Sequence, residues 1–436
     1  MRKSIISLLV AMGLPTAAWC ADGDTFTAET KEGAVVTYRV LSEDEKTCQI
    51  GGALTPRYTN YVAIKDYTGD VTIPSEVNGY TVTLIKFNAF GATSDIWVSN
   101  TEDANLHINR LQLPETITTI EEGAFYSGDI KHVNWPSKAV CEGAPFSNCT
   151  NLETVDLPEG ITELPAHLFD FCTSPVTESF VIPATVKNIG ENCFANSNLK
   201  SIVIPATVEF VGSRAFNDCD LLTSAVVESA ATNLGDYVFG GCEQLTEFTF
   251  PEGTTNVPTG ILYGTTIAEV NLPATVTTIG YGAFSSCKAL KSINLPEGLT
   301  TIDGAFDSSG LTSIVLPSTL TGITNRAFYD CPLTEITSRI VEPFSIESDI
   351  FGKDIYKTAK LYVPEGSVEL YKNTPAWSQF YGIYPDISTG ISKLQNLSQT
   401  GNGSRYTLDG RKAVSGQRGL QIVKQADGRV VKTFVR

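Results

Sequence analysis

The sequence predicts a β-rich solenoid, a fold in which short repeats stack on one another along one axis. A phrase recurs about every 22 to 23 residues, for example at 111–125, 204–219 and 272–287. Within each phrase apolar residues alternate as in a half-buried strand, and a proline follows. The chain has 436 residues, more than the ~250–300 that one globular core supports, whereas a solenoid buries each repeat against its neighbours.

The proline is the best reference point within the repeat. Apolar residues precede it by six, three and one positions, as do Leu311, Ile314 and Leu316 before Pro317. A second apolar pair follows, and then an Ala-Phe pair that predicts a short helical turn. We expect the phenylalanines to stack inside the coil as an aromatic spine: Phe125, Phe169, Phe194, Phe216, Phe239, Phe284 and Phe328.

The full pattern, L-x-x-I-x-L-P-x-x-L-x-x-I-G-x-x-A-F-x-x-C, resembles the BspA-like, Treponema-pallidum-type leucine-rich repeat. The resemblance covers roughly residues 70–340 and implies about eleven or twelve stacked repeats with short parallel strands. The departures are local. Glu228 replaces a proline, Leu262 replaces a phenylalanine, the repeats ending at Phe146 and Phe306 are shortened, and residues 91–106 form an insertion.

Both ends of a solenoid need caps, because the terminal repeats would otherwise expose their core. Strand-like runs at 34–40 and 61–64 predict an N-terminal hairpin cap over 21–66. The repeats would occupy 67–340. A last strand at 359–366 and a helical segment at 367–380, which supplies Trp377 to cover the final coil, predict a C-terminal cap over 341–385.

Ten cysteines in an exported chain usually indicate disulfides, but six of these occupy one repeat position, three residues after the spine phenylalanine or its equivalent. Side chains at one position of stacked coils run parallel, whereas a disulfide needs converging Cβ vectors. We therefore expect a buried, reduced ladder; the alternative is bridging at Cys149–Cys172 and Cys219–Cys242. The six are Cys149, Cys172, Cys219, Cys242, Cys287 and Cys331, while Cys48, Cys141 and Cys193 lie outside this register.

The N-terminus carries Arg2-Lys3, an apolar run over 5–14 and small residues near Cys20. This pattern is typical of a secretory signal peptide over 1–20, with cleavage near Cys20 or after Ala21. A lipoprotein signal with Cys20 as lipid acceptor is the alternative, and bulky Trp19 argues against it. No later stretch reaches the ~20 apolar residues of a transmembrane helix. The sequence predicts export to the cell surface, the outer membrane or the medium.

The last segment, 386–436, differs in charge from the repeats. From Ile391 onward nine basic residues outnumber two acidic ones, a net charge of +7, whereas the whole chain carries −17. Strand-like runs at 406–412 and 419–424, with a turn at Gly428, resemble the C-terminal sorting domain of the type IX secretion system. That resemblance implies outer-membrane crossing and surface attachment or release. The alternative is a small structural β module.

Catalysis finds little support in this sequence. The only histidines are His107, His132 and His167, and hydrolase, phosphate-loop and dinucleotide motifs do not occur. The lack of a CxxC pair gives no support for a zinc site, so we expect neither a metal nor another cofactor. The acidic charge disfavours a nucleic-acid partner, which would require clustered Lys and Arg. We predict a non-catalytic protein.

The exposed strand positions form a mostly small and polar stripe, poor in the residues that dominate interface hot spots. Within it we single out an apolar strip with two acidic neighbours, and we add one aromatic residue of the insertion: Val181, Val203, Val226, Glu247, Glu269 and Trp97. A plain solvated sheet face is the alternative. The family resemblance implies surface proteins and adhesins, with host-matrix or other bacterial surface proteins as partners. Glycan binding or nutrient capture, and a structural envelope spacer, are the other hypotheses.

Overall fold

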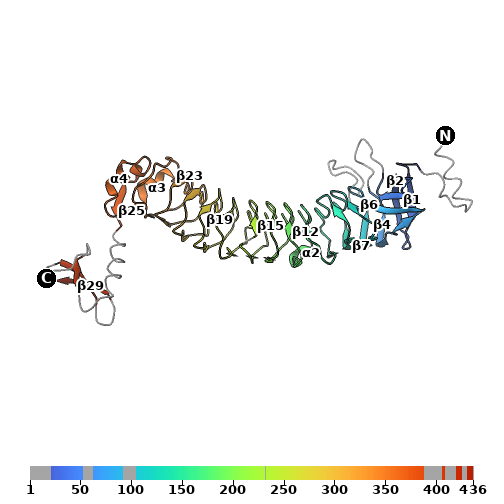
Figure 1. Cartoon of the computed structure of the whole chain (residues 1–436), viewed down its shortest axis with the longest axis horizontal. Helices are drawn as coiled ribbons and strands as arrows, with labels where there is room; N and C mark the ends of the chain where they lie inside the picture. Colours follow the sequence, from blue (N-terminus) through green and yellow to red (C-terminus); the bar gives the residue numbers. More distant parts are fainter. Residues whose placement is uncertain are drawn as a thin grey trace, which may run out of the picture.

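The computed structural model describes residues 21–52, 62–91, 105–230 and 232–386, together with the backbone of three strands between 405 and 435. The chain winds as a parallel β-solenoid of about twelve turns with repeats of about 23 residues, which confirms the predicted fold. Figure 1 shows the coils stacked side by side along one axis, from blue strands near the N-terminus to orange elements near residue 380.

An antiparallel hairpin and a third strand close the first coil: β1 (Thr25–Glu29), β2 (Val35–Ser42) and β3 (Thr47–Ile50). Strand β3 then pairs in parallel with β6 (Tyr80–Ile85), against which β5 (Glu76–Val77) folds back antiparallel. The cap and the first coils thus share one sheet, and no open edge is left between them.

The predicted strand at 61–64 was wrong, because Val62, Ala63 and Ile64 are buried without entering a strand. Ala63 instead links strand β2 to the turn that contains Ala89, through two backbone hydrogen bonds. Its carbonyl accepts a hydrogen bond from Thr37 N–H at 2.8 Å, and its own N–H donates to Ala89 O at 2.7 Å. Tyr61 lies outside the described residues.

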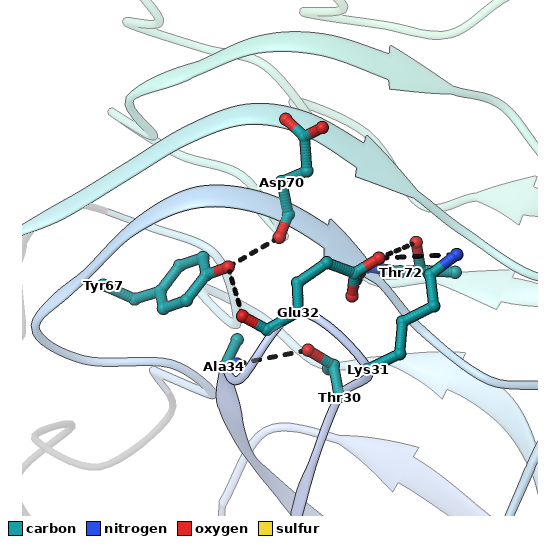
Figure 2. Close-up of polar contacts among 7 residues, drawn as sticks. All are labelled: Thr30, Lys31, Glu32, Ala34, Tyr67, Asp70 and Thr72. Carbon is teal, nitrogen blue, oxygen red and sulfur yellow. Dashed lines mark hydrogen bonds and ion pairs between the residues drawn. The ribbon is translucent and has the colours of Figure 1, made fainter.

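Polar contacts fasten the hairpin turn to the strand β4 (Tyr67–Thr72), as Figure 2 shows. Thr72 donates from its hydroxyl to Glu32 Oε1 at 2.7 Å and from its N–H to Glu32 Oε2 at 3.2 Å, while Tyr67 Oη donates to the carbonyls of Glu32 and Asp70. Burial by itself would raise the pKa of Glu32, but the hydrogen bonds from Thr72 outweigh it and hold that pKa below its ordinary value.

The strands that precede the repeat proline form one face of the solenoid, divided into three parallel sheets. The first contains β4, β7 (Leu106–Gln112), β9 (Ile130–Asn134) and β11 (Thr154–Asp156); the second β14 (Ser201–Ile204), β16 (Ser224–Val227) and β18 (Glu247–Thr249); the third β22 (Ser313–Leu316), β24 (Glu335–Ser338), β25 (Lys360–Val363) and β26 (Gly382–Pro385). Between the last two sheets the described residues show only the isolated bridge Asn271–Asn294.

One expected strand, at 179–182, does not form. The short helix α2 (Pro175–Glu178) directly precedes these residues, with Pro175 in its first turn, where a missing N–H costs nothing. The strand face therefore breaks between β11 and β14.

A second parallel ladder runs along the solenoid after the proline, built from strands of two or three residues. Its first section, β8 (Thr119–Ile120) and β10 (Val140–Cys141), continues the cap sheet. The next sheet contains β12 (Glu163–Leu164), β13 (Asn188–Ile189), β15 (Phe210–Val211) and β17 (Asn233–Leu234). The last contains β19 (Asn256–Val257), β20 (Thr278–Ile279), β21 (Thr301–Asp303) and β23 (Gly322–Thr324).

Prolines account for the two breaks in this second ladder. Where the ladder continues, the residue after the short strand donates its N–H to the preceding coil, as Gly190 does to Leu164 O and Gly280 to Val257 O, at 2.8 and 2.9 Å. Pro165 follows β12 and Pro258 follows β19 at this same position. Proline has no N–H to donate, so the ladder stops on the N-terminal side of both strands.

The Ala-Phe segments form hydrogen-bonded turns, and their phenylalanine rings stack through the core. Along the spine from Phe90 to Phe239, neighbouring ring centroids lie 4.9 to 6.0 Å apart. Leu262 interrupts the spine, and Phe248 packs against Phe239 at 5.4 Å beside this gap. All seven predicted members are buried, and Phe90, Phe146, Phe306 and Phe351 extend the stack.

The strand face continues into the segment predicted as the C-terminal cap, because β24, β25 and β26 pair in parallel beyond residue 340. Two helices, α3 (Lys353–Thr358) and α4 (Val368–Asn373), and a 3-10 turn at Trp377–Gln379 complete this end. Trp377 is fully buried, and its indole N–H donates to Phe344 O at 2.9 Å.

The C-terminal segment contains an antiparallel three-stranded sheet of β27 (Arg405–Thr407), β28 (Gly419–Lys424) and β29 (Val430–Val435). The predicted strand at 406–412 begins as expected, and its part from Leu408 to Lys412 lies outside the described residues.

Candidate binding surfaces

The middle sheet of the strand face positions two of the three valines singled out from the sequence. Val203 in β14 and Val226 in β16 are directly paired Cα partners, with exposed fractions of 50% and 45%. The residues on either side of Val203 and of Val226 are buried in the coil, so the alternation fixes both valines outward. These neighbours are Ile202 and Ile204, and Ala225 and Val227. The two side chains form an apolar strip on rigid backbone.

Val181 does not share this geometry. It is 81% exposed but lies after α2 and outside any strand. Glu247 is exposed on β18, where it is the Cα partner of Ser224, one strand beyond the valine pair. Glu269 is exposed outside any strand. The ladder thus brings Val203, Val226 and Glu247 onto one sheet and leaves the other two on neighbouring coils.

The predicted insertion ends earlier than expected, since Leu106 is already the first residue of β7. Trp97, the aromatic candidate of this insertion, lies outside the described residues, and so does Cys20 of the predicted cleavage site.

The six register cysteines are buried and unpaired by disulfides, as are Cys48 and Cys193; Cys141 is half-buried. Each register thiol donates to a backbone carbonyl of the preceding coil: Cys219 to Phe194 O, Cys242 to Phe216 O and Cys287 to Leu262 O, all at 3.1 Å. Cys149, Cys172 and Cys331 make the same contact at 2.9 to 3.1 Å. The thiols thereby add a second donor to the carbonyls of Phe125, Leu262 and Phe306, which also accept an N–H of their own turn, and they donate likewise to the carbonyls of Phe194, Phe216 and Cys149.

Burial raises the pKa of four register thiols, those of Cys149, Cys172, Cys287 and Cys331. It brings Cys172 to about 12 and both Cys287 and Cys331 to about 11. A thiol is nucleophilic and binds metals as the thiolate, so these four side chains are poorly suited to either role at neutral pH. The hydrogen bond between Cys219 and Cys242 raises the pKa of Cys242, whereas the pKa of Cys219 is lowered although burial by itself would raise it.

The histidines are spread over separate coils and each contacts a nearby side chain. His107 meets Asp129, His132 Nδ1 lies 2.8 Å from Thr154 Oγ1, and His167 Nδ1 lies 2.8 Å from Asp170 Oδ2. Over the described part of the chain, no group of three or more His, Cys, Asp or Glu side chains could hold a metal ion.

A second exposed surface, which the sequence reasoning did not identify, lies on the turns that carry the spine. We call it the turn edge; it comprises the residues within three positions of each spine residue, from Ala166 to Asp330. Tyr263 and Tyr281 are 43% and 51% exposed there, and Phe171 is 54% exposed with a φ of 55°. A left-handed conformation is unusual for a bulky residue. The aromatic residues that flank the spine position were the signal in the sequence that could have identified this surface.

Two hollows coincide with the breaks in the second ladder. One, of about 460 Å³, lies between β10 and β12 and is lined by residues that include Trp135, Val140 and Pro165. The other, of about 260 Å³, lies between β17 and β19 and includes Leu234 and Pro258 in its lining.

No helix within the described ranges has the length and apolar character needed to cross a membrane.

A family model described as the BspA type leucine-rich repeat region matches residues 102–223 and 212–335, with six copies of the repeat. Together these ranges span more than half of the 436 residues. The chain therefore belongs to the BspA-type leucine-rich repeat family. Its members and structural neighbours include bacterial cell-surface proteins.

Several solved structures resemble the chain, among them the following three. The pneumococcal vaccine antigen PcpA is 16% identical, with 84% of this chain and 100% of that chain covered and a TM-score of 0.48. A leucine-rich repeat protein from Bacteroides ovatus is 20% identical, with 72% and 94% covered and a TM-score of 0.43. A leucine rich cell surface protein from Faecalibacterium prausnitzii is 21% identical, with 86% and 98% covered and a TM-score of 0.43. No curated protein sequence matches the chain.

Proposed function

We propose that this is an exported cell-surface protein that binds other proteins through its solenoid surface and performs no catalysis. The observation that carries the proposal is the register of Val203 and Val226, two half-exposed apolar side chains paired on a rigid parallel sheet. Paired on adjacent strands, the two valines form a small contiguous apolar patch on an otherwise mostly polar face, which is where we place the contact with a partner.

An acidic side chain beside the strip supports a proposal about the partner's charge. Exposed Glu247 lies one strand beyond Val226. We therefore expect a protein surface with a small apolar centre and basic side chains at its rim, on a host-matrix protein or on another bacterial surface protein. The strip alone is smaller than a standard interface of ~1,600 Å², so neighbouring coils would supply the remaining contact area.

A charge placed within the strip tests the proposal. In Val203→Lys the ammonium group must lose its water on binding, so we expect the affinity for a protein partner to fall about tenfold or more. The matched control is Val315→Lys, since Val315 is 38% exposed at the same repeat position of β22, outside the strip.

The measurement is surface binding of the immobilised mature protein to host-matrix proteins, bacterial surface extracts and a glycan array. Saturable protein binding that falls in Val203→Lys and persists in Val315→Lys supports the proposal. Binding to glycans alone would favour the nutrient-capture function. No binding to any of these would favour an envelope spacer.

The proposal that the protein is exported rests on the sequence patterns at the two ends of the chain. We propose that residues 1–20 are a signal peptide cleaved near Cys20 and that the basic segment 386–436 is a sorting tail of the type IX secretion system. The antiparallel sheet of β27, β28 and β29 supports a small autonomous β module at that end.

A further inference from the structure

We infer that the turn edge carries a second binding site, distinct from the valine strip: an aromatic platform for a neutral glycan chain, formed by Tyr263 and Tyr281 and supported by Tyr237. These tyrosines come from three successive coils, those of Phe239, Leu262 and Phe284. Tyr263 and Tyr281 are 43% and 51% exposed, and Tyr237 is half-buried beside them.

Glycines of the following coils make room for two of the rings. A Cβ at Gly260 would lie 2.3 Å from Cδ1 and Cε1 of Tyr237, and a Cβ at Gly304 would lie 2.7 Å from Cδ2 and Cε2 of Tyr281. Both rings therefore rest directly on neighbouring backbone, which no other residue type would permit. An aromatic ring supported in this way is a pre-organised surface for stacking.

Two neighbouring side chains hold the supporting ring in place. The guanidinium of Arg214 lies 5.6 Å from the Tyr237 ring centroid, and the Tyr263 ring meets Tyr237 edge to face at 6.0 Å. Tyr237 and Arg214 both adopt left-handed backbone, with φ of 55° and 56°, at the same position of adjacent coils. His167, Asn192 and Arg326 share this positive φ, so the conformation belongs to the repeat and sets the same backbone geometry in each coil.

The coil spacing aligns the platform along the solenoid. Parallel coils stack at ~4.8 Å, so the coils of Tyr237 and Tyr281 lie about 10 Å apart, with that of Tyr263 between them. An extended ligand lying along the edge can contact successive aromatic residues, as a chain of pyranose rings does through its C–H faces.

The composition of the edge favours a sugar over a protein. The residues beside the rings are polar or small, among them Asp236, Thr259 and Ser286, whereas the core of a protein interface is a contiguous apolar area. Carboxylate and hydroxyl oxygens are suitable partners for sugar hydroxyls. The net charge of −17 disfavours sulfated or other anionic glycans, so we assign a neutral one.

Titration of the full mature chain with neutral oligosaccharides chosen from a glycan array, followed by calorimetry, tests the inference. We expect Tyr281→Ala and Tyr263→Ala each to weaken binding about tenfold or more, while Tyr281→Phe, which keeps the ring, retains most of the affinity. Tyr381→Ala is the matched control, because Tyr381 is 92% exposed in the C-terminal cap, and it should leave the affinity unchanged within about twofold.

Val203→Lys should leave glycan binding intact, which separates this site from the proposed protein site. The inference is overturned if no neutral glycan binds saturably, or if both alanine variants bind as well as the parent while their thermal unfolding is unchanged. It is equally overturned if Tyr281→Ala abolishes binding of a protein partner and glycans do not bind, since the edge would then be a protein interface.

Discussion

Thiol groups in this protein act as hydrogen-bond donors between coils. Each register cysteine reaches a carbonyl of the preceding coil, as Cys242 does to Phe216 O. A disulfide between Cys219 and Cys242 would withdraw the thiol donors of Phe194 O and Phe216 O. Breaking such contacts costs ~1–3 kcal/mol per group, which favours the reduced ladder.

Thiol counting tests this at the residue scale. With the signal peptide cut after Cys20, an unfolded, non-reduced sample should give nine free thiols with a chromogenic disulfide reagent, and each bridge would remove two. In the native protein only the half-buried Cys141 should react readily, because the other eight are buried. A count of five or fewer in the unfolded sample would contradict the reduced ladder.

Single residues were predictable where the repeat constrains them. The spine phenylalanines and the register cysteines follow from one buried position per coil, whereas Val181 was misplaced because the residues that follow α2 form no strand although their alternation looked intact. The left-handed backbone of Phe171, Arg214 and Tyr237 does not follow from residue type; it follows from the repeat, because the positions two before and two after the spine residue have a positive φ in coil after coil.

Strands long enough to show the alternation of buried apolar and exposed residues were predictable from the sequence, and strands too short to show it were not. The strand face follows from apolar residues at every second position. The second ladder consists of strands as short as β12 and β13, which are two residues long, and two residues cannot display a period of two. Its breaks at Pro165 and Pro258 become visible only once the position of the N–H donor is known.

Pro258→Ala tests the origin of one break. The new amide would lie where Gly280 N–H donates in the next coil, and could bond to Leu234 O of β17. The hydrogen bond would add about 1 kcal/mol, and losing proline's restriction of the unfolded chain would cost a similar ~0.4–1 kcal/mol. We therefore expect little change in the melting temperature.

Hydrogen exchange by NMR gives the decisive measurement for that variant. The amide of residue 258 should exchange as slowly as that of Gly280. A control at Pro332→Ala, where the proline is exposed and lies outside any strand, should give a fast-exchanging amide. Fast exchange at 258 would mean that something other than the missing donor separates β17 from β19.

The whole molecule is a set of coils joined end to end, with both caps built into its sheets. The cap sheet runs from β1 to β10, and the last sheet from β22 to β26. Stability in such an array is a sum of coil and interface contributions. The boundaries at 66 and 340 were drawn from a change in sequence pattern, which backbone pairing does not need to follow.

Deleting residues 386–436 tests the proposed sorting role. Because β26 ends at Pro385, the solenoid loses none of its strands, and its melting temperature should stay within a few degrees of the parent value. In the native host the truncated protein should accumulate in the periplasm, as followed by cell fractionation. A truncated protein that still reaches the surface would assign the tail a purely structural role.

Because the coil spacing is constant, the number of coils between two sites sets the distance between them along the solenoid. From the coil of Phe239, which contains the strand of Val226, to the coil of Phe351 there are five steps, through Leu262, Phe284, Phe306 and Phe328. At ~4.8 Å a step the strip stands about 24 Å from the last spine residue. Gaining or losing one repeat between them would change the distance from the strip to the last spine residue by one coil spacing and leave the strip itself unchanged.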